Sequence, residues 1–144
     1  MTSSRLDQIL AETAGQYEAL TEPGADSVPP EVRIPGTATH PVLCEIRDSM
    51  AAYDRFVRSL PGRFQILGIG VEGHIGFVER GAAVRGTDVM LVKLASSTRD
   101  ANKGDFSLRG PDGKEDVSLE PAHYAITQGI GTVLAADAIL MLAW

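Results

Sequence analysis

The stretch FQILGIGVEGHIGFVE, residues 64–79, decides the fold and holds the densest cluster of reactive side chains in the chain. Its first part, residues 64–69, is short and nearly all apolar, which is typical of a strand buried on both faces. Its second part is rich in glycine and carries Glu72, His74 and Glu79. Because ligands of open α/β sheets bind beyond the carboxyl ends of strands, the stretch predicts a buried strand that leads into a functional loop.

The glycines at positions 68, 70 and 73 satisfy the GxGxxG spacing of dinucleotide-binding proteins. That motif should open a helix, yet residues 74–85 carry no helical stripe of apolar side chains. An acidic residue should also follow about 20 positions on, where this chain has Lys93. The spacing fits a tight turn after a strand equally well. We therefore expect no dinucleotide and no other cofactor.

The loop after the predicted strand combines a histidine with two carboxylates. Histidine titrates near neutrality, so His74 is a predicted general acid and base. Glu72 or Glu79 would fix its tautomer by accepting a hydrogen bond from one ring nitrogen. The alternative is a loop whose charges are simply solvated. Two glutamates and a histidine can also hold a metal ion, but no other ligand pattern supports a metal, and none is predicted.

Outward from this stretch, strands and helices alternate along the chain. The best amphipathic helix covers residues 42–60 and ends at Pro61 and Gly62. Residues 102–118 are polar and predict a loop. The remaining predicted strands are 32–34, 89–94 and 139–144, and the remaining predicted helices are 3–20, 96–102 and 126–134. This alternation predicts an α/β fold with a mainly parallel sheet covered by helices.

The predicted organisation is an N-terminal helix and linker over residues 1–30, followed by an α/β core over residues 31–144. Residues 21–30 contain three prolines and a glycine, which is typical of a linker. The last predicted strand runs to Trp144. A sheet that stops there is predicted to be incomplete, or to be completed by a second copy or a partner chain.

Bulk composition excludes several classes of function. The chain has 144 residues and a formal net charge of −6 with no basic stripe, so nucleic acid is not an expected partner. Cys44 is its single cysteine, which rules out a disulfide within the chain and a zinc cluster built on thiolates. No signal-peptide pattern and no run of about 20 apolar residues is present. We expect a cytoplasmic protein without a membrane partner.

Three motifs in order resemble the signatures of glucosamine-6-phosphate deaminases. The first is GIGVEGHIGFVE at residues 68–79, the second is STR-AN around residues 97–102, and the third is AIT-GIGT at residues 125–132. The resemblance covers residues 32–144. It implies a three-layer, modified Rossmann-like fold with helices on both faces of the sheet. It also implies ring opening of a hexosamine 6-phosphate, aldose–ketose isomerisation and release of ammonia, with a phosphorylated amino sugar as partner.

The resemblance also assigns roles to individual residues. His74 takes the place of the histidine that shuttles the ring-oxygen proton, and Glu79 that of a carboxylate that orients it. Glu72 stands where the family has aspartate and is one methylene longer. Gly70 and Gly73 are predicted to contact the substrate. Lys103 lies beside the position of the family's phosphate-binding arginine, and is the predicted replacement for it.

The N-terminal 30 residues resemble neither the glycine-rich phosphate loop of the family nor its proton-abstracting aspartate. Two alternatives to a deaminase therefore stay open: a non-catalytic relative that binds a sugar phosphate or regulates, and one part of a split enzyme. A hydrolase of the 6-phosphogluconolactonase type is a further alternative, since those proteins share the GxDGH element.

Overall fold

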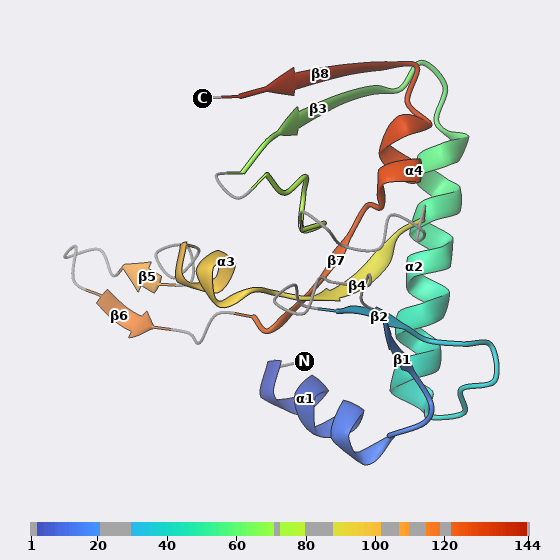
Figure 1. Cartoon of the computed structure of the whole chain (residues 1–144), viewed down its shortest axis with the longest axis vertical. Helices are drawn as coiled ribbons and strands as arrows, with labels where there is room; N and C mark the ends of the chain where they lie inside the picture. The colour runs from blue at the N-terminus through green and yellow to red at the C-terminus, as the bar shows by residue number, and fades with distance from the viewer. Residues whose placement is uncertain are drawn as a thin grey trace.

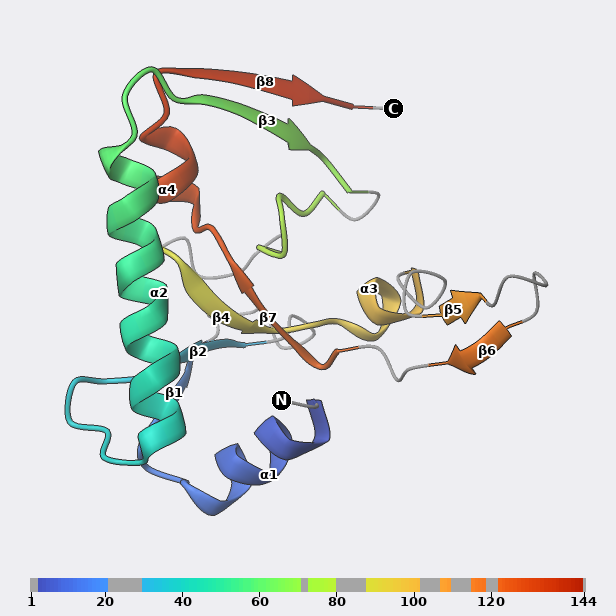
Figure 2. The same cartoon turned by 180° about the vertical axis from the view of Figure 1, so that it is seen from behind.

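The computed structural model describes residues 3–20, 30–70, 73–79, 88–101, 107–109, 115–118 and 122–143. Figures 1 and 2 show the chain from opposite sides. Its helices are α1 (Ser3–Glu12), α2 (Pro41–Ser59), α3 (Ser96–Ala101) and α4 (Ile130–Leu134). Its strands are β1 (Glu18–Leu20), β2 (Glu31–Arg33), β3 (Phe64–Gly68), β4 (Met90–Lys93), β5 (Ser107–Arg109), β6 (Glu115–Ser118), β7 (Tyr124–Thr127) and β8 (Ala138–Leu142).

The described strands form three separate sheets. The largest has the order β1-β2-β4-β7, and every neighbouring pair in it is antiparallel. Strands β5 and β6 form an antiparallel hairpin. Strands β3 and β8 form a parallel pair, with Phe64 opposite Ala138 and Gly68 opposite Leu142. A mixed α/β fold is thus confirmed, but the predicted parallel arrangement holds only for β3 and β8.

The antiparallel direction of β4 and β7 follows from the path of the chain between them. The chain leaves β4 through α3 and β5 and returns through β6 to β7, as Figure 1 shows. The predicted loop over residues 102–118 therefore contains a hairpin. The predicted helix over residues 126–134 is also corrected, because Ile126 lies in β7 and the helix begins only at Ile130.

Helix α2 forms where the sequence predicts it and organises the core. Pro41 occupies its first turn, where a missing backbone N–H costs nothing. Leu43, Met50 and Val57 recur at seven-residue spacing and are buried. Gly62, with φ +61°, lies just beyond the end of the helix. One buried cluster joins α1, the strand β2 region, α2 and β4 through Ile9, Leu10, Val32, Ile34, Ala38, Leu43, Met50, Val89 and Leu91.

The parallel pair β3–β8 contradicts the prediction of strands buried on both faces. Phe64 is 58% exposed and Ile66 59% exposed, and every residue of β8 is exposed. In Figures 1 and 2 the pair lies beside one end of α2, away from the four-stranded sheet. An apolar run shows that a strand favours burial, but neighbouring elements determine whether it is covered. No described helix covers both faces of this pair.

A carboxylate on α2 fastens the helix to α4 and β4. Thr132 Oγ1 donates to Asp54 Oδ1 at 2.5 Å, and Arg58 Nε donates to Asp54 Oδ2 at 2.8 Å. The backbone N–H of Val89 donates to the same carboxylate. Burial alone would raise the pKa of Asp54, but these hydrogen bonds hold it below its usual value.

Asp54→Ala is expected to lower the free energy of unfolding by about 3 kcal/mol, because it removes several hydrogen bonds to a buried charged group. Chemical denaturation measures the loss. Asp48→Ala is the matched control, since Asp48 is an exposed aspartate of the same helix whose ion pair with Arg47 should contribute at most about 1 kcal/mol. Equal losses in the two variants would contradict the fastening role of Asp54.

Helix α1 is attached to the strand β7 region through Asp7. His123 Nδ1 lies 2.5 Å from Asp7 Oδ2. Burial, followed by the neighbouring charge and hydrogen bond of Asp7, raises the pKa of Tyr124 to about 12. The neutral phenol is therefore the form that the folded state favours.

Tyr124 predicts a loss of stability in alkaline solution. Its pKa is higher in the folded state than the ordinary value of 10.0, so its contribution is complete below pH 10 and is lost as pH rises toward 12. The thermal midpoint of wild type should fall more steeply across this window than that of Tyr124→Phe. Parallel curves for the two proteins would refute the contribution of Tyr124.

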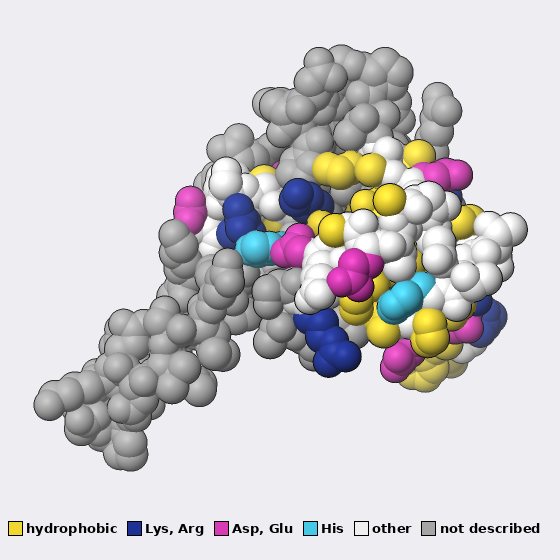
Figure 3. Space-filling model, turned by 90° about the horizontal axis from the view of Figure 1, so that it is seen from below, with side chains coloured by type: hydrophobic (Ala, Val, Ile, Leu, Met, Phe, Trp, Pro, Cys, Tyr) yellow, Lys and Arg dark blue, Asp and Glu magenta, His cyan; other side chains and the backbone are white. Residues whose placement is uncertain are grey.

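The described surface carries charges of both signs. Figure 3 views the face that includes α1 and shows Lys and Arg side chains at separate points among acidic and hydrophobic ones. Over the described part of that face they form no continuous stripe. Among the described residues, no helix combines the length and the apolar character needed to cross a membrane.

Candidate active site

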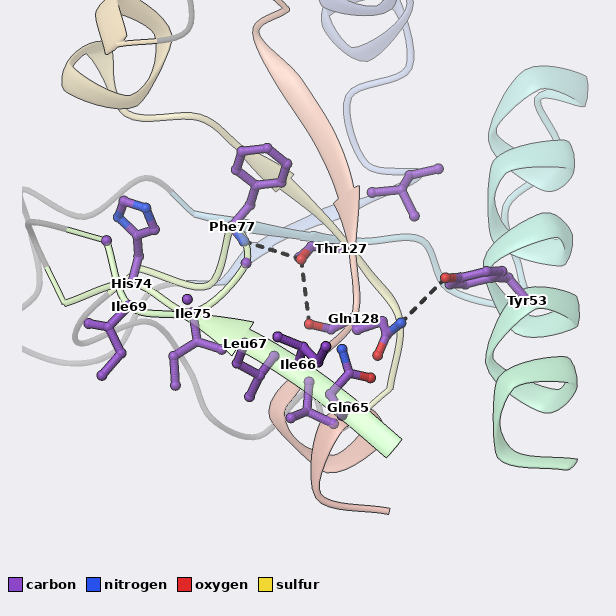
Figure 4. A pocket seen from close by; sticks show the side chains of 15 residues that line it. Tyr53, Gln65, Ile66, Leu67, Ile69, His74, Ile75, Phe77, Thr127 and Gln128 are labelled. Atoms are coloured by element: carbon purple, nitrogen blue, oxygen red, sulfur yellow. Dashed lines mark hydrogen bonds between the residues drawn. The ribbon is translucent and has the colours of Figure 1, made fainter. Parts of the chain in front are cut away.

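Two consecutive tight turns follow β3 and fold the chain back on itself. The backbone N–H of Gly73 donates to the carbonyl of Gly70 at 2.8 Å, and that of Gly70 donates to the carbonyl of His74 at 3.0 Å. Ile75 and Val78 then exchange backbone hydrogen bonds of 3.2 and 3.0 Å. Gly73 has φ +79°, a conformation that favours glycine. These turns place His74 at the carboxyl end of β3, as Figure 4 shows.

Gly70 is needed where it stands because the imidazole of His74 packs against its backbone. A Cβ atom at position 70 would overlap three atoms of that ring, namely Cε1, Nε2 and Cδ2. The ring would have to move from its present position to make room for such an atom. The missing side chain of Gly70 makes room for the histidine, while its predicted contact with the substrate stays a prediction.

His74 and Glu79 lie together, as the sequence predicts. Their side chains are only 23% and 13% exposed, and His74 Nδ1 lies 3.9 Å from Glu79 Oε2. That distance is about 1 Å too long for a hydrogen bond, and Nδ1 has no hydrogen-bond partner among the described residues. Orientation of the imidazole by the carboxylate therefore stays a prediction, which a small shift of either side chain would fulfil.

Glu79 is itself held in place by α3. Thr98 Oγ1 donates to Glu79 Oε1 at 3.0 Å, and Thr98 is buried. This hydrogen bond leaves Oε2 as the oxygen that faces His74. Sequence reasoning did not assign a role to Thr98, although it belongs to the second motif. The signal was therefore present in the sequence, but only the fold shows that α3 reaches Glu79 in the segment that follows β3.

A cavity of about 730 Å³ opens beside His74. Most of its wall is apolar, and its polar side chains come from α2, β3, the turn after β3, β7 and the residue that follows β7. Its described lining consists of Tyr53, Gln65, Ile66, Leu67, Gly68, Ile69, Gly70, His74, Ile75, Gly76, Phe77, Ile126, Thr127, Gln128 and Val133. The volume lies within the usual range of small-molecule sites.

Polar contacts fix the far wall of the cavity, as the dashed lines of Figure 4 show. The backbone N–H of Phe77 donates to Thr127 Oγ1 at 3.2 Å, and Gln128 Nε2 donates to the hydroxyl of Tyr53 at 3.3 Å. Gln128 Oε1 is buried and has no hydrogen-bond partner among the described residues. An acceptor is thus present on the wall that a hydroxyl-bearing ligand would meet.

Three further residues were predicted to belong to the site, namely Gly73, Glu72 and Lys103. Gly73 contributes its backbone conformation rather than a side chain. Glu72 and Lys103 lie outside the described residues, so their predicted roles remain predictions. In the described part of the chain, no group of three His, Cys, Asp or Glu side chains is arranged to hold a metal ion.

Fold and site together define a mixed α/β protein with a histidine and a carboxylate close together in the turns that follow a strand. No protein-family model matches the chain. It is, however, 37% identical to a glucosamine-6-phosphate deaminase of Bifidobacterium longum over 135 residues, which cover 89% of this chain and 46% of the relative.

Two further curated relatives agree with this match. The chain is 42% identical to a glucosamine-6-phosphate deaminase of Streptococcus suis over 92 residues, covering 64% of this chain and 35% of the relative. It is 39% identical to one of Bacillus thuringiensis over 99 residues, covering 69% of this chain and 34% of the relative. The chain belongs to the glucosamine-6-phosphate deaminase family, and it spans less than half the length of these relatives.

Proposed function

We propose that the site at His74 acts on a hexosamine 6-phosphate, opening its ring and converting it to a ketose phosphate and ammonia. The observation that carries the proposal is the His74–Glu79 pair, with 3.9 Å between Nδ1 and Oε2, at the mouth of a cavity of about 730 Å³. The named activity of the relatives points to the same chemistry.

In this proposal His74 transfers the proton that ring opening requires. The pyranose ring opens when the ring oxygen gains a proton and the hydroxyl on C1 loses one, and an imidazole can carry a proton between such atoms. Glu79 orients the imidazole and stabilises its charged form, while Thr98 orients Glu79. Glu72 would act as a second carboxylate, and Lys103 would pair with the phosphate.

The full reaction needs a further proton transfer at C2. Moving that proton to C1 turns the aldose into a 2-imino compound, and one water then replaces the nitrogen to give the ketose and ammonia. Among the described residues that line the cavity, His74 is the only titratable side chain besides Tyr53. The C2 base is therefore not assigned to any of the described lining residues.

The assay that tests the proposal follows ammonia and ketose phosphate released from glucosamine 6-phosphate by the purified chain. Equal amounts of the two products are expected. A folded chain that binds glucosamine 6-phosphate without releasing ammonia would support a sugar-phosphate-binding relative instead. Hydrolysis of 6-phosphogluconolactone in the absence of deamination would support the lactonase alternative.

A second proposal concerns a partner that completes the sheet, and the exposed pair β3–β8 favours it. A two-stranded sheet is marginal by itself in water. This pair exposes large apolar side chains to solvent, namely Phe64, Ile66 and the β8 residues Ile139–Leu142. We propose that a second copy or a separate chain of the same family covers this pair. Light scattering should then show an oligomer of the purified chain, or a complex once the partner is added; a stable, inert monomer would refute the proposal.

A further inference from the structure

A second cavity, of about 440 Å³, lies between α2 and β2 and shares no lining residue with the cavity at His74. Apolar side chains such as Met50 and Ile34 form part of its wall, and charged side chains form much of the rest. The described lining consists of Glu31, Val32, Arg33, Ile34, Arg47, Met50, Ala51, Asp54, Arg55, Asp88, Val89 and Met90.

Strand and helix periodicity bring the charged side chains together. Glu31 and Arg33 are two positions apart on β2, so they point to the same face of that strand. Arg47, Ala51 and Arg55 recur every four residues on α2 and therefore share one side of that helix. Three guanidinium groups and one glutamate thus border a single cavity.

The two aspartates of the lining share one arginine. Arg58, which lies outside the lining, donates to Asp54 at 2.8 Å and to Asp88 at 3.0 Å. Arg33 and Arg55 make no hydrogen bond or ion pair with any of the described residues, and both are exposed. The three arginines and three carboxylates of the lining balance in formal charge, but Arg33 and Arg55 are guanidinium groups that no described carboxylate holds in an ion pair.

The two remaining charged residues of the lining are Arg47 and Glu31. Arg47 is held by Asp48 and by the carbonyls of Pro35 and Gly36. Glu31 is 8% exposed, and its Oε2 is buried without a hydrogen-bond partner among the described residues. Burial raises the pKa of Glu31, and the charge of Arg33 opposes the rise. A buried carboxyl oxygen without a donor is costly unless a ligand supplies one.

We propose that this cavity binds a small phosphomonoester that carries hydroxyl groups, with its phosphate on Arg33 and Arg55 and a hydroxyl donating to Glu31. Guanidinium groups recognise phosphate through paired N–H donors in a fixed fork. The hydroxyl meets Glu31 Oε2, a buried acceptor that the described residues leave without a donor. The site is separate from the one at His74, so it does not depend on the function proposed there.

The test is a titration of the isotopically labelled chain with glycerol 3-phosphate, followed by nuclear magnetic resonance. Saturable shifts are expected at the amides of residues 31–34 and 54–55. Arg33→Gln and Arg55→Gln should each weaken binding about tenfold or more. Arg5→Gln is the matched control, since Arg5 is an exposed arginine on α1 that lines neither cavity. It should bind as wild type does, and so should His74→Ala.

Glu31→Leu separates the two contacts of the ligand. It should weaken binding of glycerol 3-phosphate while leaving that of inorganic phosphate unchanged, because inorganic phosphate has no carbon-borne hydroxyl to place. Three outcomes would each overturn the proposal. They are shifts confined to residues 66–77, unchanged affinity in Arg33→Gln and Arg55→Gln, and the absence of any saturable shift. Thermal melting confirms that the variants are folded, since Arg33 and Arg55 are exposed.

Discussion

His74→Ala is expected to lower kcat for ammonia release from glucosamine 6-phosphate by at least about 100-fold, the usual contribution of a positioned acid–base group. The imidazole lies at the end of β3, faces Glu79 and lines the larger cavity. Removing it leaves Tyr53 as the only titratable side chain among the described residues that line the cavity. The unfolding midpoint should change little, because Nδ1 makes no hydrogen bond within the described structure.

His40→Ala provides the matched control for this variant. His40 precedes α2, its side chain makes no capping hydrogen bond, and it does not line the larger cavity. Its kcat should equal that of wild type. Turnover by His74→Ala at the wild-type rate would show that neither His74 nor its pairing with Glu79 takes part in the reaction.

Gly70→Ala is expected to reduce kcat to a similar extent while retaining His74. The new methyl group would occupy the space of the imidazole, so the ring must leave the position that it holds near Glu79. A displacement of about 1 Å is enough to cost roughly 100-fold in rate. The measurement pairs kcat with the resonance of the His74 ring proton, whose shift reports the displacement.

Gly36→Ala is the control for the glycine substitution itself. No atom lies within 4 Å of the Cβ position at Gly36, and no strained backbone conformation is recorded there. That variant should keep both the wild-type rate and the wild-type resonance. If Gly70→Ala kept them too, the close packing of Gly70 on His74 would have no part in activity.

The elements that the sequence predicts best are those with a long or dense apolar pattern. Helix α2, strand β4 and strands β3 and β8 all appear close to the predicted residues. The directions of the strands and their burial could not be predicted in this way. An apolar run is the same in a parallel and an antiparallel sheet, and its burial depends on neighbours far along the chain.

The missed elements show where local patterns mislead. Ile126, Ile130 and Val133 have the spacing of a helix face, yet β7 ends at Thr127 and Gly129 precedes α4. Pairing of β7 with β4 outweighs the helical spacing. The hairpin β5–β6 lies in a stretch of polar and turn-forming residues, where two short strands give no apolar alternation to detect.

In the candidate site too, contacts within a short motif could be predicted from the sequence, and contacts between distant segments could not. The approach of His74 to Glu79 follows from a short motif, because only the four residues of a tight turn separate them. The packing of His74 on Gly70, and the hydrogen bond from Thr98, depend on backbone geometry and on α3. The network of Asp54 with Thr132, 78 positions apart, had no local signal at all.

The most direct test of the His74–Glu79 site is the exchange between the α and β anomers of glucosamine 6-phosphate, followed by nuclear magnetic resonance. Ring opening interconverts the anomers even where deamination does not follow. The purified wild-type chain is predicted to accelerate the exchange, and His74→Ala to leave it at the uncatalysed rate. An uncatalysed rate with folded wild-type chain, or equal acceleration by His74→Ala, would contradict the proposed role of the site.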